Sequence, residues 1–195
     1  MNILKHFTYI SLCASLLIAA PVNKKEAELA SAIELGNKGS TLLLKTLGKN
    51  MKKSMGNGGV MKALDFCSNE AYSLTEKVNQ QLPNGVRVKR VSAKYRSPAN
   101  KPSEKEIAVL KSFETMKELN IILPKYVVEK VDTHVYKYYK PLLINKKVCL
   151  KCHGVIKDID LKREIAGKYP LDTALGYKMG DLRGAVIVTI DKSVK

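Results

Sequence analysis

The sequence is short of acidic residues and has no recognisable nucleic-acid-binding motif. Its 34 lysines and arginines outnumber its 18 aspartates and glutamates, which gives a formal net charge of +16 at pH 7. Such a charge is compatible with nucleic-acid binding, but no helix-turn-helix, zinc-finger or RNA-binding signature accompanies it. We therefore interpret the charge as a lysine-rich solvated surface that steers an acidic redox partner or anionic lipid headgroups towards the protein. We expect no nucleic-acid partner.

Only one long apolar run is present, and it lies at the N-terminus. Lys5 precedes the run, which extends from Phe7 to Ala20 and ends in small residues. The run is shorter than the ~20 apolar residues that a membrane-spanning helix needs, and its composition is typical of a secretory signal peptide. We therefore predict a signal peptide over residues 1–20 and a periplasmic protein that is soluble or peripherally attached to the membrane. An uncleaved signal would leave it membrane-anchored.

Cysteine and histidine are scarce, with 4 and 3 residues in the chain, so their clustering is informative. Cys149 and Cys152 lie three positions apart, and His153 follows directly. This is the pattern of c-type haem attachment, in which two thiols bind the haem vinyl groups and the imidazole is the proximal iron ligand. Half of a zinc site, a redox-active Cys-x-x-Cys and a structural disulfide are alternatives. Because haem is attached to c-type cytochromes after export, the signal peptide supports the haem interpretation.

Cys67 remains once the signal peptide and the haem motif are set aside. It lies in a run whose apolar residues recur at steps of three and four, so we expect it to face inward from a helix. A lone thiol in a compartment that favours disulfides is a candidate sixth ligand of the iron, and a small buried hydrophobic side chain is the alternative. Other candidates for that position are His134, Met51, Met55, Met61, Met116 and Met179.

Residues 21–195 are predicted to form one domain with an N-terminal helical extension. We expect helices over 24–47, 60–78, 103–119 and 158–166, the third opened by a capping box of Ser103 and Glu106. A break is expected at Gly48 and at 56–59. Strands are expected at 86–91, 126–131, 134–139 and 184–190. Strands that are not joined by crossover helices favour an antiparallel sheet, and hence an α+β fold.

Four stretches of the chain carry a more specific signal: 90–100, 149–154, 168–177 and 180–185. Together they resemble a bacterial haem-c domain family long catalogued as a domain of unknown function, with a likeness that extends over roughly residues 27–190. That family occurs as the extracytoplasmic part of some sensor histidine kinases and as small stand-alone exported cytochromes. The resemblance implies an α+β fold with a PAS-like antiparallel sheet, N-terminal helices and one covalently bound haem c.

The resemblance also implies which residues hold the haem. Cys149 and Cys152 would form the thioethers, His153 would be the proximal ligand, and the Cys67 thiolate would be the ligand opposite it. Three arginines in the matched stretches are candidates to pair with the haem propionates, with ordinary surface charge as the alternative: Arg90, Arg96 and Arg183.

These assignments favour a haem protein that is not an enzyme. A thiolate ligand favours ferric iron, so His153/Cys67 ligation predicts a six-coordinate, low-potential haem. Loss of the iron–sulfur bond would free a position for NO or CO. The first hypothesis is therefore a redox or gas-responsive sensor module that acts on an unknown signalling or redox partner. The second is a simple periplasmic electron-transfer cytochrome.

Two further readings have less support. A small peroxidase would need an open distal site and an acid–base residue, and the sequence has no evident distal histidine–arginine pair. A haem-free zinc domain would use Cys67, Cys149, Cys152 and His153 as its ligands. The sequence contains no kinase domain, so the signalling role of fused relatives is not transferred. It leaves open whether the N-terminal helices form a homodimer.

Overall fold

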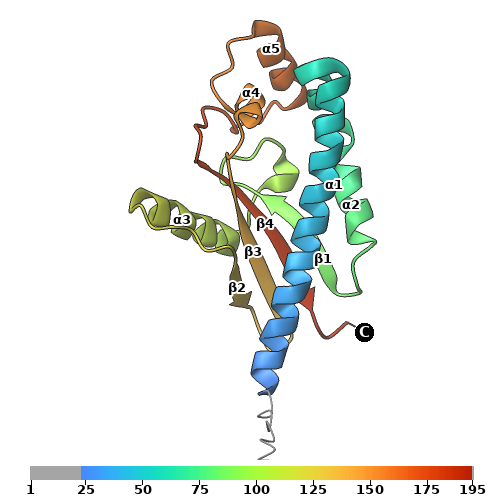
Figure 1. The fold of residues 1–195 in the computed structure, drawn as a ribbon, viewed down its shortest axis with the longest axis vertical. Helices are drawn as coiled ribbons and strands as arrows, with labels where there is room; N and C mark the ends of the chain where they lie inside the picture. The colour runs from blue at the N-terminus through green and yellow to red at the C-terminus, as the bar shows by residue number, and fades with distance from the viewer. Residues whose placement is uncertain (1–22, 195) are drawn as a thin grey trace, which may run out of the picture.

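The computed structural model describes residues 23–194, so the predicted signal peptide lies outside the described residues (Figure 1). Its centre is one four-stranded sheet with the strand order β1-β4-β3-β2, in which every neighbouring pair is antiparallel. The strands are β1 Val86–Val91, β2 Val127–Lys130, β3 Val135–Leu143 and β4 Leu182–Asp191. The predicted α+β fold with an antiparallel sheet and N-terminal helices is confirmed.

Helices cover both faces of the sheet and one of its ends (Figure 1). They are α1 Lys24–Asn69, α2 Ala71–Asn79, α3 Glu104–Glu118, α4 Leu150–His153 and α5 Ile159–Lys168. Because side chains alternate along a strand, Tyr138 packs with α1 and α2 on one face, while the next residue, Tyr139, packs with Phe113 of α3 on the other. None of the helices within residues 23–194 is long and apolar enough to cross a membrane.

Helix α1 is longer than predicted and bends near its C-terminal end. It continues through Gly48, so the break expected there is wrong, whereas the break expected at 56–59 is confirmed. Only Gly58 and Gly59 leave helical geometry, and Gly59 has a φ of 67°, which glycine adopts readily. At this point the chain turns back on itself near the top of Figure 1. The helix predicted over 60–78 is therefore two helices, which meet at Glu70 between the last limb of α1 and α2.

The remaining local predictions hold. Ser103 and Glu106 form the expected capping box at the start of α3. Strands β2 and β3 pair as a hairpin, in which the Asp132 carboxylate accepts hydrogen bonds from the backbone N–H groups of His134 and Val135. Strand β3 extends beyond the predicted end, to Leu143, because its last residues continue to pair with β4. This extension carries the chain directly to the Cys-x-x-Cys-His segment.

Candidate functional site

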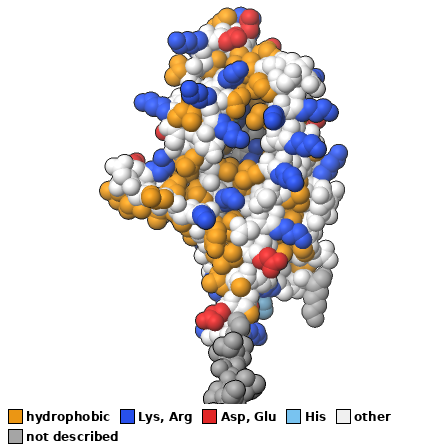
Figure 2. Space-filling model, in the orientation of Figure 1, with side chains coloured by type: hydrophobic (Ala, Val, Ile, Leu, Met, Phe, Trp, Pro, Cys, Tyr) orange, Lys and Arg blue, Asp and Glu red, His pale blue; other side chains and the backbone are white. Residues whose placement is uncertain are grey.

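A cavity of about 440 Å³ lies between α1, α2, α4 and the adjoining ends of β1 and β3. Its volume is within the range of small-molecule and cofactor sites. Figure 2 shows this face hollowed in its upper half, with lysine and arginine side chains around the hollow and apolar side chains within it. All of the site residues predicted from the sequence line this one cavity: Cys67, Arg90, Arg96, Cys149, Cys152, His153 and Arg183.

The alternative candidates for the sixth ligand lie in different parts of the structure, and only some of them line the cavity. Met51 and Met55 of α1 line the cavity. His134 precedes β3, at the end of the sheet where its carbonyl oxygen accepts a hydrogen bond from the Lys192 N–H. Met116 packs in the core on the opposite face of the sheet. Of the alternatives to Cys67, only Met51 and Met55 are among the residues that line the cavity, whereas Met61 of α1 and Met179 are exposed.

The Cys-x-x-Cys-His segment forms a short helical turn at the edge of the cavity. A 3₁₀ turn over Lys147–Cys149 leads into α4, so Cys149 and Cys152 lie about one turn apart, and both are partly buried. The segment is fastened to a later loop, because the N–H of Tyr177 donates to the carbonyl oxygen of His153 at 2.9 Å. Both thiols thus lie on one rigid turn beside the imidazole.

The imidazole of His153 is held in one orientation. Its Nδ1 lies 3.0 Å from the carbonyl oxygen of Ala174, and Nε2 has no hydrogen bond within residues 23–194. Burial, followed by repulsion from Arg183 and Arg96, lowers the pKa of His153 from 6.5 to about 3. The ring is therefore neutral at pH 7. Because a carbonyl only accepts, Nδ1 carries the proton, and the lone pair of Nε2 is available to a metal.

Cys67 lies where the returning limb of α1 borders the cavity. The expectation that it faces the core is wrong, because its side chain is exposed to the cavity while Leu64 and Phe66 are buried. One residue corresponds to about 100° on a helix, so Cys67 points away from the direction of Phe66. Protein atoms shield the thiol from bulk water, and this burial raises the pKa of Cys67, whereas Arg90 and Arg96 lower it.

The three predicted arginines have different surroundings. Arg96 is buried and forms an ion pair with Asp172, with 3.0 Å between nitrogen and oxygen. Arg183 donates to Ser92 Oγ at 2.6 Å and to the Lys94 carbonyl oxygen at 3.1 Å. Arg90 makes no hydrogen bond or ion pair within the described part of the chain, and burial lowers its pKa. Of the three, Arg90 has the guanidinium that is most available to an anionic ligand in the cavity.

The donor set of the cavity suits haem better than zinc. Two thiols one turn apart and a neutral imidazole with an available Nε2 match the groups that hold a c-type haem. A zinc site would instead need Cys67, Cys149, Cys152 and His153 to converge on one point. Residues 23–194 contain no group of three or more histidine, cysteine, aspartate or glutamate side chains arranged to hold a metal ion. A preformed zinc site is thus not present among them.

Sequence reasoning missed the residues that support His153. Asp172, Ala174 and Tyr177 lie in the loop before β4 and contact the histidine or the arginines around it. The signal for them was the matched stretch 168–177, which marked the loop as distinctive but did not give its residues a role.

The chain is similar to a known family and to a protein of known structure. A family model described as Tll0287-like matches residues 18–191. The crystal structure of the cyanobacterial haem protein Tll0287 has a similar fold, with a TM-score of 0.59 and 21% identity over 89% of this chain and 99% of that chain. No curated protein sequence matches. The extent of the family match, together with the shared fold, shows that this chain belongs to the Tll0287-like family.

Proposed function

We propose that this protein is an exported monohaem c-type cytochrome that acts as a redox or gas-responsive sensor module. The observation that carries the proposal is the convergence of Cys149, Cys152, His153 and Cys67 on one cavity. Membership of a family that includes a haem protein supports the same cofactor. We further propose a periplasmic location, no catalytic turnover and an unidentified redox or signalling partner.

Each residue has a distinct part in this proposal. The thiols of Cys149 and Cys152 add across the two vinyl double bonds, with each sulfur bonding to one carbon and the thiol proton passing to the other, so no electrons are exchanged. His153 would hold the iron through Nε2, and Cys67 would be the second protein ligand, as a thiolate. Haem, when bound, supplies a one-electron couple and an axial position for NO or CO. Because Cys67 is the candidate ligand that α1 carries, it is the residue through which a redox change would reach this helix.

Optical and EPR spectra of the purified haem protein test the ligation. We expect a low-spin thiolate signature in the ferric protein, and its loss in Cys67→Ala. Met51→Leu and Met55→Leu are matched controls, because both methionines line the same cavity, and their spectra should equal that of the wild type. A Cys67→Ala spectrum identical to the wild type would rule out the thiolate. A change in Met51→Leu or Met55→Leu would identify a methionine ligand instead.

A simple electron-transfer cytochrome is the second candidate. It is favoured by the position of the haem motif, where the side chains of Lys146, Lys147 and Lys151 are exposed beside the partly buried Cys149 and Cys152. Such a positive surface attracts an acidic redox partner. Spectra of the ferrous protein separate the two functions. Retention of both axial ligands on reduction favours the carrier, and loss of Cys67 on reduction, followed by binding of CO, favours the sensor.

A further inference from the structure

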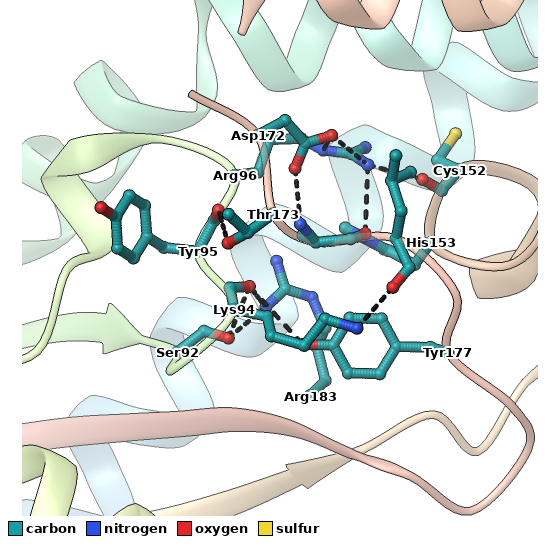
Figure 3. Close-up of polar contacts among 12 residues, drawn as sticks. Ser92, Lys94, Tyr95, Arg96, Cys152, His153, Asp172, Thr173, Tyr177 and Arg183 are labelled. Carbon is teal, nitrogen blue, oxygen red and sulfur yellow. Dashed lines mark hydrogen bonds and ion pairs between the residues drawn. The ribbon is translucent and has the colours of Figure 1, made fainter. Parts of the chain in front are cut away.

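A chain of polar contacts connects His153 to Arg96 and Asp172, two residues outside the Cys-x-x-Cys-His segment. Arg96 Nε donates to Asp172 Oδ2 at 3.0 Å, and Asp172 Oδ1 accepts from the Ala174 N–H at 2.7 Å. The carbonyl oxygen of the same Ala174 lies 3.0 Å from His153 Nδ1, and Figure 3 shows Arg96 and Asp172 beside His153. Asp172 thus fixes the peptide group on one side of Ala174, and that residue's carbonyl fixes the imidazole.

The Arg96 guanidinium also contacts this arrangement directly. Its Nη2 donates to the carbonyl oxygen of Cys152 at 2.6 Å and to that of Ala174 at 3.3 Å. The Cys152 carbonyl belongs to the peptide bond that leads into His153, and the Ala174 carbonyl is the acceptor for its ring. One planar group therefore holds both the backbone and the hydrogen-bond acceptor of the histidine.

The ion pair between Arg96 and Asp172 is shielded from solvent. The two side chains are 9% and 5% exposed, whereas those of the Arg163–Asp160 pair on α5 are 73% and 74% exposed. A buried pair pays a large desolvation cost and is weak evidence for stability alone. Here both members of the pair make further hydrogen bonds to the loops around His153. Besides the Arg96–Asp172 contact, Asp172 Oδ1 accepts from the Ala174 N–H, and Arg96 Nη2 donates to the carbonyl oxygens of Cys152 and Ala174.

We propose that Arg96 and Asp172 are positioning residues that set the orientation and donor strength of His153, and through them the reduction potential of the haem. The inference rests on the proposed function, since it assigns His153 to the iron. A hydrogen bond from Nδ1–H to a fixed acceptor raises the basicity of the metal-binding nitrogen, and a more basic ligand favours ferric iron. Weakening this hydrogen bond therefore raises the potential.

Two conservative variants separate geometry from charge. Arg96→Lys keeps the positive charge but replaces the planar fork with a single ammonium, which does not reproduce the guanidinium contacts with Asp172, Cys152 and Ala174. Asp172→Asn keeps an oxygen acceptor for the Ala174 N–H but removes the ion pair. In redox titrations of the haem-loaded protein, we expect a higher potential in both variants. The matched controls are Arg163→Lys and Asp160→Asn in the exposed pair, and they should leave the potential unchanged.

A second readout follows the histidine itself. Nitrogen-15 NMR of the imidazole in the chain expressed without haem distinguishes the Nδ1–H tautomer from the Nε2–H tautomer. We expect the Nδ1–H tautomer in the wild type and a mixture in Arg96→Lys. If the wild-type chain never acquires haem, the proposed function fails, and this measurement still tests the positioning role. An Arg96→Lys protein with the wild-type tautomer overturns the proposal. So does one that is less stable but has the wild-type potential.

Discussion

Gly36 of α1 lies directly against the aromatic ring of Tyr138 on β3, so closely that a Cβ atom at residue 36 would overlap ring atoms. The same stripe of the helix contains Ala32 and Ser40, which are fully buried. Small residues at these positions let the helix backbone rest on the sheet. The helix that forms one wall of the cavity is therefore positioned by a contact some distance from it.

Replacing this glycine should destabilise the fold. Gly36→Ala forces a shift of the helix or of the buried Tyr138 ring, and we expect a loss of about 1–3 kcal/mol in the free energy of unfolding, as is typical of overpacking. Gly48→Ala on the same helix is the control, because a Cβ there meets nothing within 4 Å. Alanine favours helix over glycine by about 0.5–1 kcal/mol, so Gly48→Ala should stabilise. Urea unfolding measures the change in the free energy of unfolding of each variant. If both variants changed by the same amount in the same direction, the close contact of Gly36 with Tyr138 would be contradicted.

Glu106 makes stability depend on acid pH. Its side chain is only 1% exposed, and it accepts hydrogen bonds from Lys89 at 2.9 Å and Lys137 at 3.1 Å. Burial acts to raise its pKa, but hydrogen bonds from the Ser103 N–H, Lys89 and Lys137 outweigh it and lower the pKa from 4.5. Because the folded-state pKa is the lower one, the stabilisation is complete above about pH 4.5 and is lost as pH falls through the folded-state value.

Glu106→Gln should therefore make the free energy of unfolding depend less on pH in the acid range. We expect the variant to be less stable by about 1–3 kcal/mol at pH 7, because hydrogen bonds to a charged group are lost, and this difference should shrink towards pH 3. Urea unfolding at several pH values measures it. Glu104→Gln, an exposed residue on the same helix, is the control and should follow the wild type. A Glu106→Gln curve parallel to the wild type at all pH values would argue against the role of the carboxylate.

The sequence predicted what depends on local spacing. The capping box of α3, the hairpin of β2 and β3 and the turn that places Cys149 beside His153 all involve residues within a few positions of one another. The interruption at Glu70 was not predicted, because its flanking residues continue the apolar repeat and neither glycine nor proline marks the boundary. The break expected at Gly48 was wrong because one glycine lowers helix stability only modestly.

The residues that hold His153 in place could not be predicted from the sequence, for a different reason. The contact of Arg96 with Asp172 joins residues 76 positions apart, and its meaning depends on a third loop that carries His153. Periodicity reports which face of an element is buried, but not which loops meet at its end. The sequence therefore offers Arg96, like Arg90 and Arg183, as a candidate propionate partner, although the structure uses its guanidinium within the protein.

Covalent attachment of haem should depend on the two cysteines of the motif. In Cys149→Ala/Cys152→Ala, we expect no haem stain on a denaturing gel, because no thioether remains to survive denaturation. Cys67→Ala is the control, since it removes a thiol from the same cavity but from outside the motif, and it should retain the stain. Staining of the double variant, or loss of stain only in Cys67→Ala, would contradict the assignment of the two thiols.

The positive charge of Arg90 should raise the reduction potential of the haem, and that of Arg87, on the same strand, should not. Arg90 lines the cavity and has no ionic partner within residues 23–194, whereas Arg87 is exposed and paired with Glu76 at 3.0 Å. A nearby positive charge favours the ferrous state, which carries one positive charge less than the ferric state. Arg90→Gln should therefore lower the potential on the order of 50 mV, which corresponds to about 1 kcal/mol for one electron.

Redox titration against Arg87→Gln isolates this effect, because both substitutions remove one positive charge from β1 and only one of them faces the cavity. We expect the potential of Arg87→Gln to match the wild type at physiological salt, where exposed charges are screened. Raising the salt concentration should leave the shift of Arg90→Gln nearly unchanged, since a buried charge is screened much less. Equal shifts in the two variants would mean that net charge, rather than contact with the cofactor, sets the potential.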